Sequence, residues 1–379
     1  MPEAVRDGDV DLSVVVLLGS RWDALESFST RWREVVRCWA SDARVGALTV
    51  VDHPAMRRRA LVSRGPLVAE APSWHSGVRR LSVTVPVGPD RHVTDGIGWA
   101  RAARALRRQL PRARREVIVA ATPLAAPLLS RLRDSRTTTA FDGVDHWNLR
   151  RRFAHAADRL DEGFRAAAGA DLVSAVAQSL ADELAGLGAV APVVVPNGAD
   201  AGALVNPREP GVAVALPEPP FAVYVGTLGG RLNLGLLIET AAALTDVPIV
   251  AVGPAADAAA EKQVRDSRLH WVGPLPPDDL PWVLSRSACA LLIYQDTGLF
   301  EAVDSMKLLQ YVAGGMPVVS TPLPGLPHGV RVGTDAQSLA AQIREAVHAK
   351  PSSAPLYPDI VVPPWSEVAN RLLTLYLGG

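Results

Sequence analysis

The chain has 379 residues, of which 48% are hydrophobic and 21% charged, and its formal net charge at pH 7 is zero. This length is typical of two domains rather than one, and the chain is apolar enough for full cores. No run of 18 apolar residues predicts a membrane span, and the acidic N-terminus does not match a secretion signal. Two distant cysteines give neither zinc-site spacing nor a disulfide framework, so we expect a cytoplasmic protein.

The zero net charge hides a difference between the two halves of the chain. Residues 1–197 hold 28 Lys and Arg against 22 Asp and Glu, a net of +6, and the remainder holds 11 against 17, a net of −6. Two interpretations of the arginine-rich first half stay open. Its clusters are solvated helix faces, or they form a face for an acidic acceptor or an anionic membrane surface. Nucleic acid is not expected as a partner, because the clusters lack interleaved aromatic residues.

The first half alternates apolar runs with helical patterns, which predicts a parallel sheet. We expect strands at residues 12–18, 45–51, 81–85, 117–120, 137–141, 170–174 and 193–195. Helices are expected at residues 26–40, 97–110, 123–132 and 148–168. Residues 53–80 are expected to be irregular.

Polar residues follow two of these strands at their carboxyl ends, where open parallel sheets place ligands. The candidate residues after the first strand are Gly19, Trp22 and Asp23, and those after the strand at 137–141 are Asp142, Asp145 and His146. The competing interpretation is that Asp23 caps a helix, and that Asp145 and His146 lie at a helix N-terminus with its own caps.

The second half begins after a crossover at residues 195–200, and proline-rich residues 207–220 indicate a linker. Strands are expected at residues 221–225, 249–252, 269–272, 289–294 and 318–320. Helices are expected from residue 234, at 257–265, 278–285 and 305–313, and at the end of the chain over 365–377. This alternation of strands and helices implies a second parallel sheet with right-handed crossovers.

Two segments of the second half offer groups that bind phosphate. Gly226, Thr227 and Gly230 allow a ligand close to the backbone, and the neighbouring Arg231 can pair with phosphate oxygens. The other segment is a helix start, where Ser305 can act as the cap. The first-turn N–H groups there favour an anion, and this segment comprises Asp304, Ser305, Met306 and Lys307.

The segment SMKLLQYVAGGMPVVSTPLPG, residues 305–325, resembles the donor-binding segment of family 4 glycosyltransferases. These are retaining enzymes of the GT-B fold, with two facing Rossmann-like domains. FDGVDHW at 141–147 and VPNGAD at 195–200 resemble further parts of the family, the former its teichuronic-acid-type members. The resemblance covers most of the chain, and it is strongest over residues 221–326.

The resemblance implies an α/β fold of GT-B type with parallel sheets and a C-terminal crossover helix. Residues 1–197 would form the acceptor domain, 198–363 the nucleotide-sugar donor domain, and 364–379 a helix that crosses back to the first domain. It implies retaining, metal-independent transfer without a cofactor, from a UDP-, GDP- or dTDP-sugar. The acceptor would be a glycan, a lipid carrier or a secondary metabolite, with peripheral membrane contact through the basic first domain.

The resemblance also implies roles for single residues. Asp145 would lie near the attacking hydroxyl. Arg231 and Lys307 are the cations available in this sequence to stabilise the leaving diphosphate. The family's usual Lys after the arginine is not apparent, unless Lys307 takes its place. The family's ribose-binding Glu falls on Gln310, and a second family Glu falls on Ala302. These departures leave three functions open, namely an active glycosyltransferase, a non-catalytic partner protein, and a sugar-nucleotide epimerase on the same fold.

Overall fold

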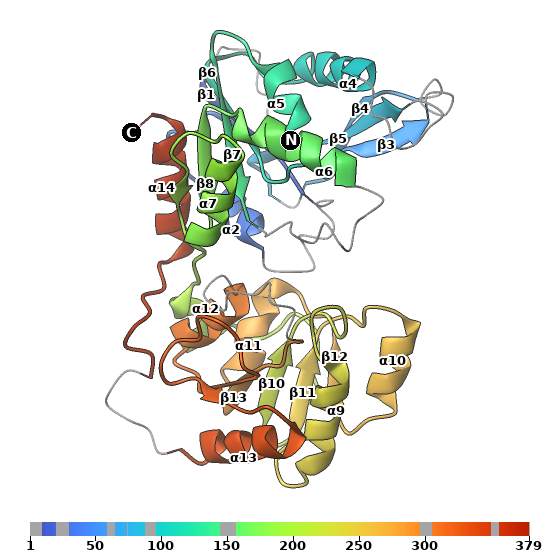
Figure 1. Ribbon diagram of the computed structural model, residues 1–379, viewed down its shortest axis with the longest axis vertical. Coiled ribbons are helices and arrows are strands. Elements are labelled where there is room, and N and C mark those ends of the chain that lie inside the picture. The colour runs from blue at the N-terminus through green and yellow to red at the C-terminus, as the bar shows by residue number, and fades with distance from the viewer. Residues whose placement is uncertain are drawn as a thin grey trace. The chain divides into compact units, whose positions relative to one another are not determined.

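A computed structural model describes residues 10–19, 30–58, 65–73, 75–87, 96–144, 157–295, 305–349 and 356–378. The chain divides into two compact units (Figure 1). Unit 1 consists of Met1–Pro196 with Trp365–Gly379, and unit 2 of Asn197–Pro364. Each unit is built around its own sheet.

The sheet of unit 1 has the strand order β3-β5-β2-β1-β6-β7-β8-β9, with β4 beside β5. Only the β4–β5 pair is antiparallel among these strands. The strands are β1 (Val10–Leu17), β2 (Ala47–Val51), β3 (Ala55–Arg58), β4 (Val68–Ala71), β5 (Val78–Val87), β6 (Ala113–Ala120), β7 (Thr137–Gly143), β8 (Leu172–Ala175) and β9 (Val193–Val194). The apolar runs of the central strands are buried, as expected for a sheet covered on both faces.

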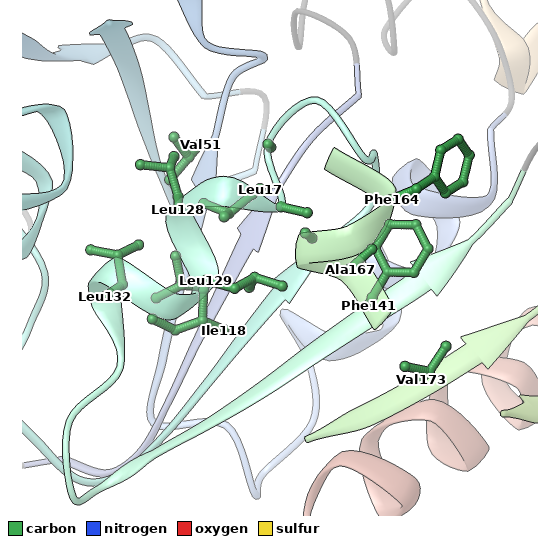
Figure 2. Close-up of a cluster of buried hydrophobic side chains, with 14 of the residues drawn as sticks. Leu17, Val51, Ile118, Leu128, Leu129, Leu132, Phe141, Phe164, Ala167 and Val173 are labelled. Carbon is green, nitrogen blue, oxygen red and sulfur yellow. The ribbon is translucent and has the colours of Figure 1, made fainter. Parts of the chain in front are cut away.

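Helices α5 and α6 cover one face of this sheet with aliphatic and aromatic side chains (Figure 2). The helices of unit 1 are α2 (Arg31–Trp39), α4 (Gly96–Arg107), α5 (Pro127–Leu132), α6 (Ala157–Ala168), α7 (Gln178–Gly186) and α14 (Trp365–Tyr376). Helix α14 comes from the end of the chain and packs on α2. There the Trp39 indole N–H donates to the Ala369 carbonyl at 2.9 Å, and its ring meets that of Tyr376 edge to face.

Unit 2 contains a six-stranded, fully parallel sheet in the order β12-β11-β10-β13-β14-β15. This is the strand order of a doubly wound nucleotide-binding sheet. The strands are β10 (Ala222–Val225), β11 (Ile249–Val252), β12 (His270–Gly273), β13 (Cys289–Leu292), β14 (Val318–Ser320) and β15 (Arg331–Val332). The helices are α8 (Ala201–Val205), α9 (Leu234–Ala243), α10 (Ala258–Arg265), α11 (Leu280–Leu284), α12 (Met306–Ala313) and α13 (Ala336–Val347), with a 3-10 turn at Pro277–Asp279.

Alternate residues of β10 enter two separate hydrophobic clusters. Ala222 and Tyr224 point into the first cluster, and Val223 and Val225 into the second. Because successive strand residues face opposite sides, helices must cover both faces of the sheet. The predicted α/β fold with parallel sheets in two domains is confirmed.

Two local predictions are wrong. Residues 53–80 are not irregular, because they contain β3, β4 and the start of β5. These strands carry no continuous apolar run, and their pairing with β5 makes them strands. The predicted helix over 26–40 is not continuous, because Thr30 is extended and caps α2 by accepting from the Arg33 N–H; residues 26–29 lie outside the described residues.

Candidate functional site

The candidate site of unit 2 lies where the strand order reverses, between β10 and β13. The chain moves from β10 to β11 on one side, and β13 pairs with β10 on the other. Open parallel sheets bind ligands outside the carboxyl ends of the strands at such a point. The two phosphate-binding segments predicted from the sequence follow β10 and β13.

The loop after β10 is a tight glycine turn. Gly226, Gly229 and Gly230 have φ angles of 140°, 123° and 64°, which favour glycine. The Gly226 N–H donates to the Val252 carbonyl at 2.8 Å. A Cβ on Gly253 would overlap the Gly226 carbonyl, so the loops after β10 and β11 touch through their backbones.

The same loop is tied to the segment that follows β13. The Gln295 N–H donates to the Arg231 carbonyl, and the Asn233 N–H donates to the Ile293 carbonyl, both at 3.0 Å. These bonds fix exposed Arg231 beside the end of β13. Thr227 is also exposed, and its carbonyl accepts from the Tyr224 hydroxyl at 3.1 Å.

Helix α12 begins with a cap that leaves donors available. The Ser305 hydroxyl accepts from the Leu308 N–H at 3.4 Å, and the Ser305 carbonyl accepts from the Leu309 N–H at 3.0 Å. No acceptor in the described part of the chain takes the N–H groups of Met306 and Lys307. These two donors, with the helix dipole behind them, suit an anion.

Lys307 brings the two segments together. Its side chain reaches back to Gly226, where a Cβ would overlap the ammonium. Burial disfavours the charged form, but interactions with Tyr294 and Tyr224 outweigh it and raise the pKa of Lys307 above its usual value. Lys307 therefore carries a positive charge at neutral pH, next to the glycine turn.

Gln310 lies one turn further along α12. It is partly exposed, while Leu308, Leu309 and Tyr311 are buried. Residues three apart share a helix face, so Gln310 lies on the same side of α12 as Lys307. Its side chain makes no hydrogen bond with any described residue. Contact between Gln310 and a ribose stays a prediction, and Asp304 lies outside the described residues.

The acceptor-side residues belong to unit 1, and four of them (Trp22, Asp23, Asp145 and His146) lie outside the described residues. Gly19 is exposed at the end of β1, and a Cβ there would contact Thr122 just after β6. Since the strand order of unit 1 reverses between β1 and β6, Gly19 lies at the corresponding position of its own sheet.

Asp142 is fully buried at the end of β7, and both its oxygens are engaged. The Arg31 guanidinium contacts the two oxygens at 2.8 and 3.2 Å, and the Ser174 hydroxyl donates to one at 2.6 Å. That hydroxyl also lies 2.7 Å from the Tyr376 hydroxyl on α14. This environment indicates a structural role for Asp142 rather than contact with an acceptor.

The sequence interpretation did not include Tyr224 and Tyr294, whose rings flank Lys307. Both stand in apolar strand segments, where an aromatic residue is typical of core, so no pattern distinguished them. Within the described residues, no cluster of three His, Cys, Asp or Glu is placed to bind a metal ion. No described helix is long and apolar enough to span a membrane.

Residues 219–349 match the family model described as glycosyl transferases group 1, and this range contains all the described residues of the candidate donor site. A protein of Bacillus subtilis named "Putative teichuronic acid biosynthesis glycosyltransferase" is 28% identical over 104 residues. That match covers 27% of this chain and 26% of the relative, so it spans about a quarter of each protein.

Solved glycosyltransferase structures share the fold. A UDP-forming trehalose-phosphate synthase from Burkholderia xenovorans is 11% identical, with a TM-score of 0.63 over 97% of this chain and 99% of that one. HepE of Anabaena, in complex with UDP and glucose, is 15% identical, with a TM-score of 0.58 over 96% and 97%. The structure "Trehalose-6-phosphate from E. coli bound with UDP-2-fluoro glucose" is 12% identical, with a TM-score of 0.57 over 96% of this chain and 94% of that one. The fold is therefore GT-B, and residues 219–349 of unit 2 are similar to the glycosyl transferases group 1 family.

Proposed function

We propose that the chain is a glycosyltransferase that moves a sugar from a nucleotide-sugar donor to an acceptor hydroxyl, with the donor held by unit 2. One observation carries this proposal: Lys307 lies in the first turn of α12, and its ammonium reaches the glycine turn at Gly226. A cation beside backbone N–H groups that have no acceptor among the described residues favours a diphosphate. Two of the structural neighbours hold UDP or a UDP-sugar, which supports this choice.

The reaction needs charge stabilisation more than covalent chemistry. As the bond between the anomeric carbon and the diphosphate breaks, negative charge grows on the leaving phosphate oxygens. The Arg231 guanidinium, the Lys307 ammonium and the N–H groups of Met306 and Lys307 would stabilise that charge. The proposal includes retention of anomeric configuration and transfer without a metal ion or cofactor, as the family resemblance implies.

Unit 1 would bind the acceptor, with Asp145 near the attacking hydroxyl. The net charge of +6 in residues 1–197 favours an acidic or membrane-borne acceptor, such as a glycan or a lipid carrier. A secondary metabolite is the further acceptor class. We propose a cytoplasmic protein that contacts the inner face of the membrane peripherally.

A catalytically inactive partner protein is the competing function, because Gln310 and Ala302 stand where the family carries Glu. A sugar-nucleotide epimerase on the same fold is the third. The nature of the product distinguishes these functions. Transfer yields a joined sugar and a free nucleoside diphosphate, an epimerase yields a changed sugar nucleotide, and an inactive partner yields neither.

The first experiment is a thermal-shift screen with UDP-, GDP- and dTDP-sugars, since a ligand of the folded state raises its melting temperature. We expect a rise with at least one donor, and loss of that rise in Lys307→Met. Lys262→Met is the matched control, because Lys262 is exposed on α10 and pairs with Asp266. No shift with any donor, or equal shifts in both variants, would contradict the donor site.

The second experiment measures turnover of the donor identified by the screen. Arg231→Ala should reduce kcat/KM by about 100-fold, as expected for the loss of one strong transition-state contact. Arg268→Ala is the control, since exposed Arg268 precedes β12 and so lies near the amino ends of the strands. Full activity in EDTA is expected, and rescue of an EDTA-inactivated enzyme by Mg²⁺ would refute metal-independent transfer.

A further inference from the structure

Lys307 is a partly buried lysine that makes no ion pair with any described carboxylate. The acidic residues that precede it in the chain, Glu301 and Asp304, lie outside the described residues. The Nζ of Lys307 lies 5.2 Å from the ring centroid of Tyr224 and 5.5 Å from that of Tyr294. Both distances fall within the range of cation–π attraction.

The fold fixes both rings. Tyr224 is on β10 with 1% of its surface exposed, and its hydroxyl donates to the Thr227 carbonyl. Tyr294 follows β13 and is 7% exposed. Its N–H donates to the Thr321 hydroxyl at 3.1 Å, and that hydroxyl donates back to the Tyr294 carbonyl at 3.1 Å. β10 and the segment after β13 therefore supply two buried rings for a side chain from α12.

A desolvated ammonium is unstable unless other groups replace its water. The negative faces of the two rings and the two phenol oxygens provide this replacement. Gly226 provides the space, since any side chain there would overlap the ammonium. An aromatic pair differs from a carboxylate in one respect that matters here: it stabilises the cation without cancelling its charge.

We propose that Tyr224 and Tyr294 are positioning residues that hold the Lys307 ammonium at the Gly226 turn, ready to meet the diphosphate of the donor. This inference rests on the proposed function for the identity of the ligand. A cation fixed before binding costs no reorganisation when negative charge develops on the leaving group. The tyrosine pair would therefore contribute to donor binding and to transfer through Lys307, without touching the sugar.

The sequence makes a direct test practical, because the chain contains only three lysines: Lys262, Lys307 and Lys350. Lysine labelled with ¹³C and ¹⁵N gives three sets of side-chain NMR signals, which Lys→Arg variants assign. We expect the side-chain protons of Lys307 to be displaced upfield by the two rings, relative to those of exposed Lys262. A Lys307 signal at the position of an exposed lysine would overturn the inference without any tyrosine variant.

The variants Tyr224→Phe and Tyr294→Phe keep each ring and remove its hydroxyl. The pKa of Lys307 should fall in both, since burial remains while a stabilising partner is lost. UDP binding, measured by calorimetry, should weaken by about 10- to 150-fold, the equivalent of one hydrogen bond to a charged group. Tyr311→Phe is the matched control, because this buried tyrosine lies in the same unit, and neither the lysine's ring contacts nor its pKa shift involve it.

The outcomes separate this inference from the proposed function. An unchanged Lys307 pKa in both Phe variants would refute the positioning role, whatever the activity of the protein. The expected pKa and UDP changes in a protein that turns over no sugar nucleotide would support the positioning role and refute the transferase. If Tyr311→Phe weakened UDP binding as much as the other variants, the effect would be general loss of packing, and the inference would fail.

Discussion

Gln310 lies on the same side of α12 as Lys307, where the family resemblance places a ribose-binding Glu. A carboxylate accepts hydrogen bonds from both ribose hydroxyls, whereas an amide offers one accepting oxygen and one donating nitrogen. Gln310→Ala should therefore weaken binding of the nucleotide-sugar donor, by about 5- to 30-fold. Gln310→Glu should bind the donor as well as the wild type or better, because a charged acceptor makes stronger bonds.

Donor titration by calorimetry checks both variants. The control is Gln342→Ala, since Gln342 is also partly exposed within a helix of unit 2, α13. If Gln310→Ala bound the donor like the Gln342→Ala control, position 310 would not touch the ribose.

Gly226 combines a backbone requirement with a steric one. Its φ of 140° is strained for any other residue, and an added Cβ would displace the Lys307 ammonium. Gly226→Ala should lower the free energy of unfolding by about 1–3 kcal/mol. UDP affinity should also fall, by about 10-fold or more, as expected when a charged contact is displaced.

Urea unfolding and UDP calorimetry of the same preparations test the two effects. Gly235→Ala is the control, because Gly235 is exposed in α9 and an added Cβ would make only an ordinary contact with the Asn233 side chain at 4.0 Å. This variant should be neutral or stabilising by up to about 1 kcal/mol. A Gly226→Ala protein that lost stability and kept full UDP affinity would place the Lys307 ammonium outside the donor site.

At the scale of elements, the sequence predicted the strands that contain a continuous apolar run, such as β1 and β10. Such a run is typical of a strand that is buried on both faces of the sheet. It did not predict β3 or β4, which exist through pairing with β5. The phosphate-binding segments were predicted because glycine and capping residues act locally. The contacts of Tyr224 and Tyr294 with Lys307 were not predicted. They join β10, the segment after β13 and α12, which come together only in the folded unit.

At the end of β7 the Asp142 carboxylate contacts Arg31 of α2 and Ser174 of β8, and Ser174 in turn contacts Tyr376 of α14. Asp142→Asn removes the charge opposite buried Arg31, and breaking such a pair costs about 3–5 kcal/mol of unfolding free energy. Asp42→Asn is the control, because its pair with Arg44 is partly solvent-exposed and is worth about 1 kcal/mol or less. Chemical denaturation measures both. An Asp142→Asn protein of normal stability without transferase activity would instead restore the acceptor role of this residue.

The turn before β7 gives a pH-dependent contribution. Burial alone raises the pKa of Asp134, but hydrogen bonds from Arg136 and Thr137 outweigh it and lower the pKa to about 2. Since the unfolded carboxyl titrates near 4, this stabilisation is present above about pH 5 and is lost as the pH falls towards 2. It amounts to about 1 kcal/mol or less, because solvent screens the partly exposed pair.

The comparison that isolates this contribution is wild type against Asp134→Asn, unfolded in urea at several pH values. The stability difference should be constant from pH 7 to 5 and shrink between pH 5 and 2. A difference that stays constant down to pH 2 would show that Asp134 is not ionised preferentially in the folded protein.

At the scale of the whole molecule, each unit has its own sheet and hydrophobic core, and every described residue of the candidate donor site belongs to unit 2. The opposite net charges of the two halves of the chain follow the same division closely. If basic unit 1 binds the acceptor and unit 2 the donor, as proposed, salt should affect the binding of the two substrates differently.

Ionic strength should act differently on the two substrates. An acidic or membrane-borne acceptor would meet the exposed arginines of unit 1, whose attraction is screened beyond about 10 Å at 0.1 M salt. The donor diphosphate would meet Lys307, which is partly buried between two rings and therefore less screened. Raising NaCl from about 0.05 to 0.5 M should increase the KM of such an acceptor several-fold and change that of the donor far less. Initial-rate kinetics with each substrate varied in turn measure both constants, and an equal response of the two would refute the assignment of the acceptor to the basic unit.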